Sequence, residues 1–269
     1  MQYDPIKRSL GNVFNKSPFL RKTFYSLLDL LLLRAWHVHK ELKAFSSKSG
    51  NGLNILDAGA GFGQYSFWMW KHFKKCNILA VDVKEEQVAD CNNFFQQVGA
   101  GDRVKFIVDD LTIFKKDNLY DLVLSVDVME HILEDVLVFK NFHASMKKGA
   151  MLLISTPSDQ GGSDVHEGSE TSFIEEHVRD GYNIKEIEQK LLSAGFSKAE
   201  ARYSYGAPGK ISWRLSMKYP ILMLGASKLF FIILPFYYII AFPVSYVLNY
   251  FDVTMKHPTG TGLIVKAWK

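Results

Sequence analysis

The sequence is short of the residues that build disulfide frameworks and metal sites. Its 269 residues include only two cysteines, Cys76 and Cys91, and neither belongs to a metal-ligand motif. A fold stapled by several disulfides and a structural zinc site are therefore both excluded. We expect both thiols to be buried and inert, no metal ligands, and a reducing, cytoplasmic compartment.

A strong excess of one charge is also missing. The chain has 32 basic and 28 acidic residues, a net charge of +4. This excess is too small to indicate a nucleic-acid partner, although it suits an acidic ligand or a membrane surface. Apolar residues make up 48% of the chain, which is enough for a large core and argues against disorder.

A secretory signal is not visible either, because the first residues contain no continuous apolar stretch. A long apolar segment does occur further along the chain. Residues 229–251, LFFIILPFYYIIAFPVSYVLNYF, carry no charge and reach the length of a membrane span.

From residue 53 onward, short runs rich in Val, Ile and Leu alternate with helix-like segments. This alternation is typical of a parallel sheet covered by helices on both faces. We therefore predict an α/β fold with a doubly wound, mostly parallel seven-stranded sheet. The strands are expected at 53–59, 77–83, 104–110, 120–127, 150–156, near 198–205 and at 262–268. The helices between them are expected at 64–75, 85–98, 134–146 and 184–196.

Three regions are predicted along the chain. Residues 1–50 form an N-terminal helical extension, with a helix-like pattern over 19–45. Residues 51–205 plus 258–269 form the α/β domain, and residues 206–257 are an apolar insert between the last two strands. The segment 157–182 is longer than a simple connection needs, so we expect it to lie over the active-site edge.

The segment NILDAGAGFG (54–63) is the most informative part of the chain. A short strand ends at Asp57 and is followed by Gly59, Gly61 and Gly63. Glycines permit a tight turn and a close approach of the backbone to a ligand. The helix that follows offers unpaired N–H groups in its first turn. This pattern predicts a nucleotide-type cofactor site.

Further motifs follow in a fixed order. They are AVDV (80–83), VDDL (108–111), YDLVLSVDVMEHI (120–132) and KKGA (147–150). Together with the glycine turn, these motifs resemble the class I, Rossmann-like S-adenosylmethionine-dependent methyltransferases, over about residues 50–205 and 258–269. A nicotinamide cofactor fits less well, because Gln64 stands where G-x-G-x-x-G requires its last glycine.

The resemblance implies S-adenosyl-L-methionine as the cofactor and assigns its contacts. The contacts are Asp57, Gly59, Gly61 and Gly63 at the methionine part, Asp82 and Val83 at the ribose, Asp110 and Leu111 at the adenine, and Ser125, Val126 and Asp127 beside the sulfonium. A purely structural alternative stays open for Asp57, which would then cap the turn that follows it.

Methyl transfer from a sulfonium requires an aligned acceptor, and it requires a base only when the acceptor holds its proton tightly. His131 follows the fourth strand and is a candidate base, with a structural role as the alternative. His177 and Tyr182, in HVRDGY (177–182), are candidates for groups that face the acceptor. An Arg–Asp pair that merely orders this loop is the competing interpretation.

The insert bears on the class of acceptor. Pro235 and Pro243 interrupt its apolar run, and the last strand has to return to the sheet, so a single membrane crossing is disfavoured. We predict an apolar hairpin of broken helices that serves as a membrane-docking element, a lid over an apolar acceptor or a homodimer interface. The N-terminal segment can join it through its basic residues, Arg21, Lys22, Arg34, Lys40 and Lys43.

The sequence therefore predicts a methyltransferase for a small hydrophobic or lipid-linked acceptor. Peripheral contact with the inner face of a membrane and a homodimer are both left open. The alternative from another class is a membrane-associated protein that keeps the cofactor fold for a binding or assembly role. Deletion of 213–250 is predicted to abolish turnover and to leave cofactor binding intact.

Overall fold

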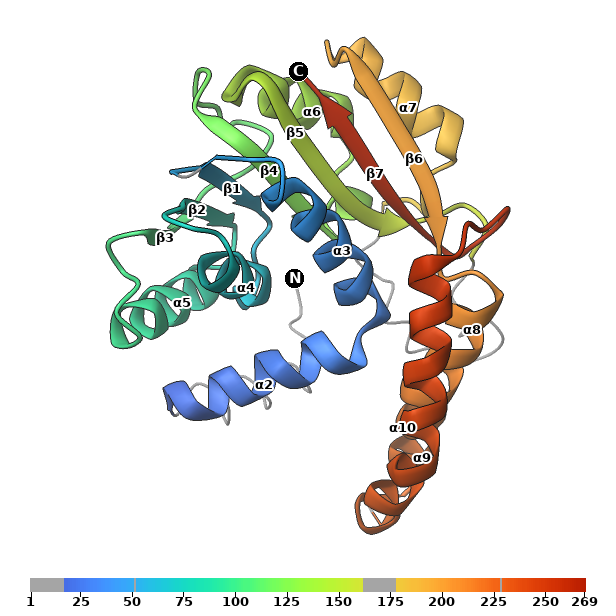
Figure 1. Cartoon of the computed structure of the whole chain (residues 1–269). Helices are drawn as coiled ribbons and strands as arrows, with labels where there is room; N and C mark the ends of the chain where they lie inside the picture. The colour runs from blue at the N-terminus through green and yellow to red at the C-terminus, as the bar shows by residue number, and fades with distance from the viewer. Residues whose placement is uncertain (1–16, 51, 162–177, 228) are drawn as a thin grey trace.

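The computed structural model describes residues 17–50, 52–161, 178–227 and 229–269. Its centre is a seven-stranded sheet in the order β3-β2-β1-β4-β5-β7-β6 (Figure 1). The strands are β1 (Asn54–Ala58), β2 (Asn77–Asp82), β3 (Val104–Val108), β4 (Tyr120–Val126), β5 (Met146–Pro157), β6 (Lys198–Ser204) and β7 (Gly262–Trp268). The first five strands are parallel, and β7 runs antiparallel to both β5 and β6. The predicted sheet is confirmed.

Helices cover both faces of the sheet, as the apolar strands require. One face carries α3 (Leu33–Ser46), α4 (Gln64–His72) and α5 (Glu85–Gln97), and the other carries α6 (Asp135–Ser145) and α7 (Ile184–Ser193). Neighbouring residues of β1 serve opposite faces, since Ile55 belongs to the first core and Leu56 to the second. The strand β5 begins at Met146, so the KKGA motif lies within it and not before it.

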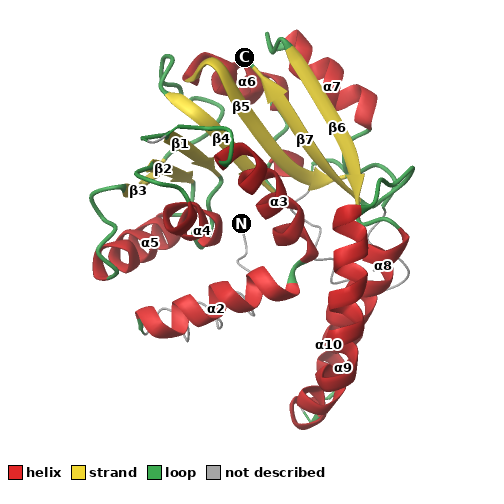
Figure 2. Cartoon of the chain, in the orientation of Figure 1, coloured by secondary structure: helices red, strands yellow, loops and turns green. Residues whose placement is uncertain are grey.

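The N-terminal extension forms two helices, and the single helix predicted over 19–45 is wrong. Helix α2 (Pro18–Leu31) ends at Leu32, whose backbone is extended, and α3 begins directly after it. The break has a tertiary cause. The Arg34 N–H donates to the Tyr205 hydroxyl (3.0 Å), and the Trp36 indole N–H donates to the Leu30 carbonyl (3.1 Å). The Arg34 N–H and the Leu30 carbonyl, which would bond to each other in a continuous helix, therefore have other partners. As a result, α2 turns away from α3 beneath the sheet (Figure 2).

The insert is a helical hairpin. One arm consists of α8 (Ala207–Trp213), the π-helical turn η2 (Arg214–Lys218) and α9 (Tyr219–Ala226), and α10 (Phe230–Thr254) forms the returning arm. The prediction that prolines break this arm is wrong, because α10 continues through Pro235 and Pro243. Both prolines lie on the exposed side of α10. On that side the carbonyl of the residue four positions before each proline can tilt away from the partner arm, so the helix continues.

Candidate active site

The predicted cofactor residues converge at the carboxyl edge of three adjacent strands. β1 lies between β2 and β4, and Ala58 is level with Val81 on one side and Ser125 on the other. The strand order changes direction between β1 and β4, which is the position where open α/β sheets bind ligands. The ends of these strands therefore bring Asp57, Asp82 and Ser125 to one edge of the sheet.

The glycine turn after β1 has the backbone geometry that the sequence predicts. Gly59, Gly61 and Gly63 all have positive φ, at 78°, 52° and 76°. A Cβ atom on Gly59 would lie 2.2 Å from the Val128 side chain, whereas a Cβ atom on Gly61 would meet nothing within 4 Å. The turn is thus packed against the protein at Gly59 and open at Gly61.

Asp82 is fixed beside this turn at the end of β2. Its Oδ2 atom accepts a hydrogen bond from Gly61 N (2.8 Å), and its Oδ1 atom accepts one from Lys84 N (3.0 Å). A carboxylate has lone pairs for more acceptor contacts than these two, as a ribose diol would require. The adjacent Val83 is exposed.

Asp57 lies beneath the turn and not on its open side. Its side chain is buried, and its Oδ2 atom accepts a hydrogen bond from the Ser66 hydroxyl (2.6 Å) in the first turn of α4. Burial raises the pKa of Asp57 to about 7. This position matches the structural alternative, in which Asp57 ties β1 to the helix that follows the turn.

The residues expected at the adenine follow β3. Asp110 is exposed, and its Oδ1 atom accepts hydrogen bonds from the backbone N and the hydroxyl of Thr112 (both 2.8 Å). Leu111 is buried in the core that α6 and α7 share. Asp109 N donates to the Asp82 carbonyl (3.2 Å), which links this loop to β2. The adenine contacts of Asp110 and Leu111 stay predictions.

The end of β4 faces the N-terminal helices. Ser125 is fully buried, and its hydroxyl has no hydrogen-bond partner among the described residues. Val126 is half-buried, and Asp127 has a left-handed backbone with φ of 51°. The Asp127 carboxylate forms an ion pair with Arg34 of α3. An unpartnered buried hydroxyl and a charged pair thus stand where the resemblance places the sulfonium.

The N-terminal helices hold the glycine turn from outside, which the sequence did not predict. Arg21 is 3% exposed and donates to the Phe62 carbonyl (3.0 Å) and to the Tyr25 hydroxyl (2.7 Å). Tyr25 donates to the same Phe62 carbonyl. Arg21 is therefore buried and does not join the insert, which corrects that expectation for Arg21. For Arg34, which pairs with Asp127 and is about one-third exposed, it stays a prediction. The spacing of Arg21 and Tyr25, four residues apart on one helix, was the available signal.

The candidate catalytic residues are not brought together. His131 is exposed in the turn η1 (Met129–His131), while the neighbouring Glu130 is buried and accepts a hydrogen bond from Thr156 (3.0 Å). Burial raises the pKa of Glu130. His177 lies outside the described residues. The candidate bases therefore still rest on sequence alone, with His131 the one placed at the carboxyl edge.

Tyr182 is fully buried, which corrects the expectation that it faces the acceptor. Its hydroxyl lies 3.1 Å from the Met129 carbonyl and 2.8 Å from the Asp135 carboxylate. Arg179 pairs with this same Asp135, and Lys190 joins it from α7 (2.8 Å). Burial opposes ionisation of Asp135, but these cations and the Tyr182 hydroxyl outweigh it and hold its pKa below the usual value. The network orders the end of the loop.

A glycine turn after β1 and an acid at the end of β2, both at the strand-order reversal, fit the class I S-adenosylmethionine-dependent methyltransferases that the sequence resembles. A family model described as a methyltransferase domain matches residues 49–200. The chain therefore belongs to the methyltransferase domain family, and its cofactor is S-adenosyl-L-methionine. The predicted family, fold and cofactor are confirmed.

Curated relatives resemble this chain over part of their length. Malonyl-[acyl-carrier protein] O-methyltransferase 2 of Ilyobacter polytropus is 27% identical over 120 residues, 45% of each chain. Phosphoethanolamine N-methyltransferase 1 of Triticum aestivum is 27% identical over 146 residues, 54% of this chain and 28% of the relative. The chain thus spans less than half the length of either relative.

Solved structures share the fold at low identity. Phosphoethanolamine N-methyltransferase 2 of Haemonchus contortus, in complex with S-adenosyl-L-methionine, has a TM-score of 0.60 at 17% identity and covers 87% of this chain and 52% of its own. The [4+2]-cyclase SpnF has a TM-score of 0.59 at 16% identity, covering 88% of this chain and 82% of its own. At this identity the likeness concerns the fold alone.

Proposed function

We propose that this protein transfers a methyl group from S-adenosylmethionine to a small hydrophobic or lipid-linked acceptor at the surface of a membrane. The use of S-adenosylmethionine is supported by the open face of the turn at Gly61, next to the Asp82 carboxylate. The hydrophobic acceptor and the membrane surface are supported by the apolar hairpin, because it extends from the same edge of the sheet as the site (Figure 1).

The residues present fit the cofactor. Asp82 accepts hydrogen bonds from the ribose, and the turn at Gly61 leaves room for the ligand beside it. The unpartnered Ser125 hydroxyl lies at the methyl-transfer end. When bound, the cofactor supplies an electrophilic methyl group on a positively charged sulfur.

The chain itself contributes alignment and exclusion of water. The Arg34–Asp127 pair lies about one-third exposed at the end of β4, so it orients α3 over the transfer site and retains access to an acceptor. α2 holds one side of the glycine turn through the Phe62 carbonyl. Alignment of this kind is the main requirement of an in-line displacement. An acceptor that holds its proton tightly also requires a base, and His131 is the candidate.

Two groups of relatives bear on the acceptor. One group has names that concern an acyl-carrier-protein substrate, and the other has names that concern phosphoethanolamine. A headgroup attached to an apolar chain combines features of both and suits a site bordered by an apolar hairpin. We therefore place the protein in the cytoplasm with peripheral contact at the inner membrane face.

A binding role without methyl transfer is the second candidate, because the [4+2]-cyclase shares the fold. Calorimetric titration with S-adenosylmethionine, followed by incubation with labelled cofactor and a lipid extract, separates the two roles. We expect binding and a labelled, organic-soluble product. Binding without a labelled product would favour the second role, and absence of binding would reject the methyltransferase.

A further inference from the structure

The hairpin of α8, η2, α9 and α10 is polar inside and apolar outside. The residues buried between its arms include Ser212, Ser216, Ser245 and Asn249. Ser212 donates a hydrogen bond to Asn249 (2.6 Å), and the Tyr238 hydroxyl donates one to the Ser216 carbonyl (2.7 Å). Small and polar residues thus hold the two arms together on the side of the hairpin next to the body, and the large apolar residues are left on its outer side.

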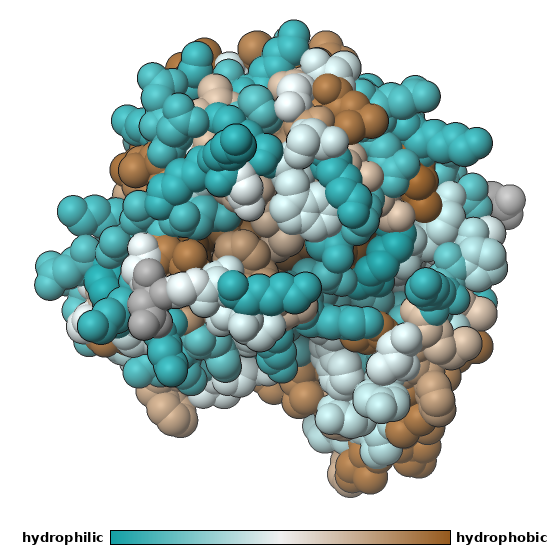
Figure 3. Space-filling model, turned by 45° about the horizontal axis from the view of Figure 1, so that its top comes forward, coloured by the Kyte–Doolittle hydropathy of each residue, from teal (hydrophilic) through white to brown (hydrophobic). Residues whose placement is uncertain are grey.

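The outer side of the hairpin is an apolar stripe along the whole of α10. Its residues follow helical spacing and are more than two-fifths exposed, as in Ile232 (69%), Phe236 (68%), Ile240 (75%) and Val247 (53%). Only 11% of the most apolar stretch of α10 is buried. Figure 3 shows hydrophobic residues, in brown, gathered at the lower right, where the hairpin projects from the body. The described part of the body leaves this surface uncovered.

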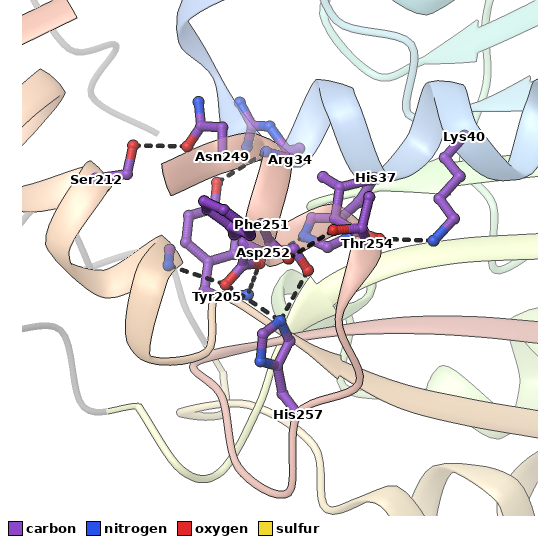
Figure 4. A network of polar contacts seen from close by, with 12 residues as sticks. Arg34, His37, Lys40, Tyr205, Ser212, Asn249, Phe251, Asp252, Thr254 and His257 are labelled. Carbon is purple, nitrogen blue, oxygen red and sulfur yellow. Dashed lines mark hydrogen bonds and ion pairs between the residues drawn. The ribbon is translucent and has the colours of Figure 1, made fainter. Parts of the chain in front are cut away.

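The base of the hairpin is tied firmly to the body (Figure 4). Asp252, at the end of α10, is fully buried and accepts hydrogen bonds from His37 of α3 (2.8 Å), Tyr205 N (3.1 Å) and Gly209 N (2.9 Å). His257 lies 3.3 Å from the same carboxylate. The hairpin is therefore a fixed projection of the α/β domain.

The charges of the hairpin indicate which partner covers its apolar stripe, a second copy of the chain or a lipid surface. Residues 206–257 contain four lysines and one arginine, but Asp252 is their sole acid and it is buried. The charge that the hairpin presents is therefore positive. A second copy of this chain would meet that charge with the same sign, whereas anionic lipid headgroups complement it.

We propose that the tip of the hairpin, residues 219–236, inserts into one leaflet of an anionic bilayer. Arg214 and Lys218 then stand at the level of the headgroups, together with Tyr237 and Tyr238, as tyrosines and cations do at membrane interfaces. This inference names the membrane contact that the proposed function expects, and it rests on that function for its biological purpose.

The dimensions of the tip match one leaflet. α9 has eight residues and reaches about 12 Å beyond Lys218, at 1.5 Å per residue, against about 15 Å for half of a hydrocarbon core. Since both arms return to the sheet, the hairpin re-enters the body on the same side.

Flotation of the full-length protein with lipid vesicles tests this proposal. Vesicles of phosphatidylcholine alone are compared with vesicles that also contain phosphatidylglycerol. We expect binding to the anionic vesicles, weakened by salt, and at least a roughly tenfold loss for Ile232→Glu with Phe236→Glu, two exposed residues of the tip. Leu192→Glu, an exposed leucine on α7 far from the tip, is the matched control and is expected to bind normally.

A second measurement locates the tip itself. Cys76 and Cys91 are buried, so a dye attached at Leu222→Cys reports from α9 alone, and the same dye at Leu192→Cys is the control. We expect the emission to shift to the blue with anionic vesicles for position 222 only. Absence of flotation, flotation unchanged by the double variant, or a lipid-free dimer that this variant dissociates would overturn the proposal. A protein that floats but transfers no methyl group would reject the proposed function and leave the docking surface standing.

Discussion

Asp57 shows how one residue can serve a motif without facing its ligand. The carboxyl group is buried beneath the glycine turn, and burial raises its pKa to about 7. The folded protein therefore binds this proton more tightly than the unfolded chain does. The Asp57 contribution to stability is most favourable below pH 4, declines as the pH rises toward 7, and is constant above it.

Asp57→Asn, which is neutral at every pH, tests this assignment. As the pH rises from 5 to 8, the natural protein should lose about 3 kcal/mol of unfolding free energy through the ionisation of Asp57, and the variant should not lose it. Chemical denaturation at the two pH values measures the difference. An identical gap between the two proteins at both values would contradict the raised pKa.

A substitution at Gly61 can distinguish a loss of space for the cofactor from strain in the backbone. Gly61→Ala places a methyl group in open space, so we expect it to lower cofactor affinity at least tenfold, with only about 1–2 kcal/mol of backbone strain. The matched control is Gly99→Ala, which also has a positive φ (74°) and equally open space, in a turn after α5. Titration calorimetry and thermal unfolding measure the two effects. Equal affinities for the two variants would show that the space at Gly61 is not used.

At the scale of elements, α2 acts as a brace on the cofactor turn. The sequence predicted a helix here but assigned its basic residues to the surface. The partners that break the helix near Leu32 and bury Arg21 are Tyr205 and Phe62, which are distant in the sequence. The arginine is instead buried against a backbone carbonyl 41 residues away. The function of this helix depends on its position against the glycine turn, which the tertiary structure sets.

Tyr25→Phe removes the hydroxyl that braces Phe62 and leaves the ring in place. We expect a loss of about 1 kcal/mol in stability and a several-fold weaker affinity for S-adenosylmethionine. Tyr120→Phe is the control, since the Tyr120 hydroxyl is buried but has no partner among the described residues. An affinity for Tyr25→Phe as high as that of the control would reject the brace.

For the whole molecule, the hairpin divides into a base and a tip. The base contains the contacts of Ser212, Asn249 and Asp252, which a deletion of 213–250 would disturb. A smaller deletion of 219–236, with a short glycine linker between Lys218 and Tyr237, spares them. We expect this variant to fold, to bind the cofactor normally and to lose turnover on lipid extracts. Full turnover would show that the tip takes no part in acceptor delivery.

The sequence alone determined the sheet, the cofactor class and the glycine turn. Each depends on patterns within a few residues, such as the apolar run of Ile55 and Leu56 or the spacing of Gly59, Gly61 and Gly63. These patterns are local because backbone conformation and strand burial are set over short distances.

Only the tertiary structure decided what the remaining polar groups do. It buried Asp57 and Tyr182, paired Arg34 with Asp127, and joined Asp252 to His37 across 215 residues. Burial and ion pairing depend on elements that are distant in the chain, so no local pattern specifies them. The same holds for the hairpin, whose apolar composition was plain in the sequence, whereas its polar inner face emerged only when its arms were packed together.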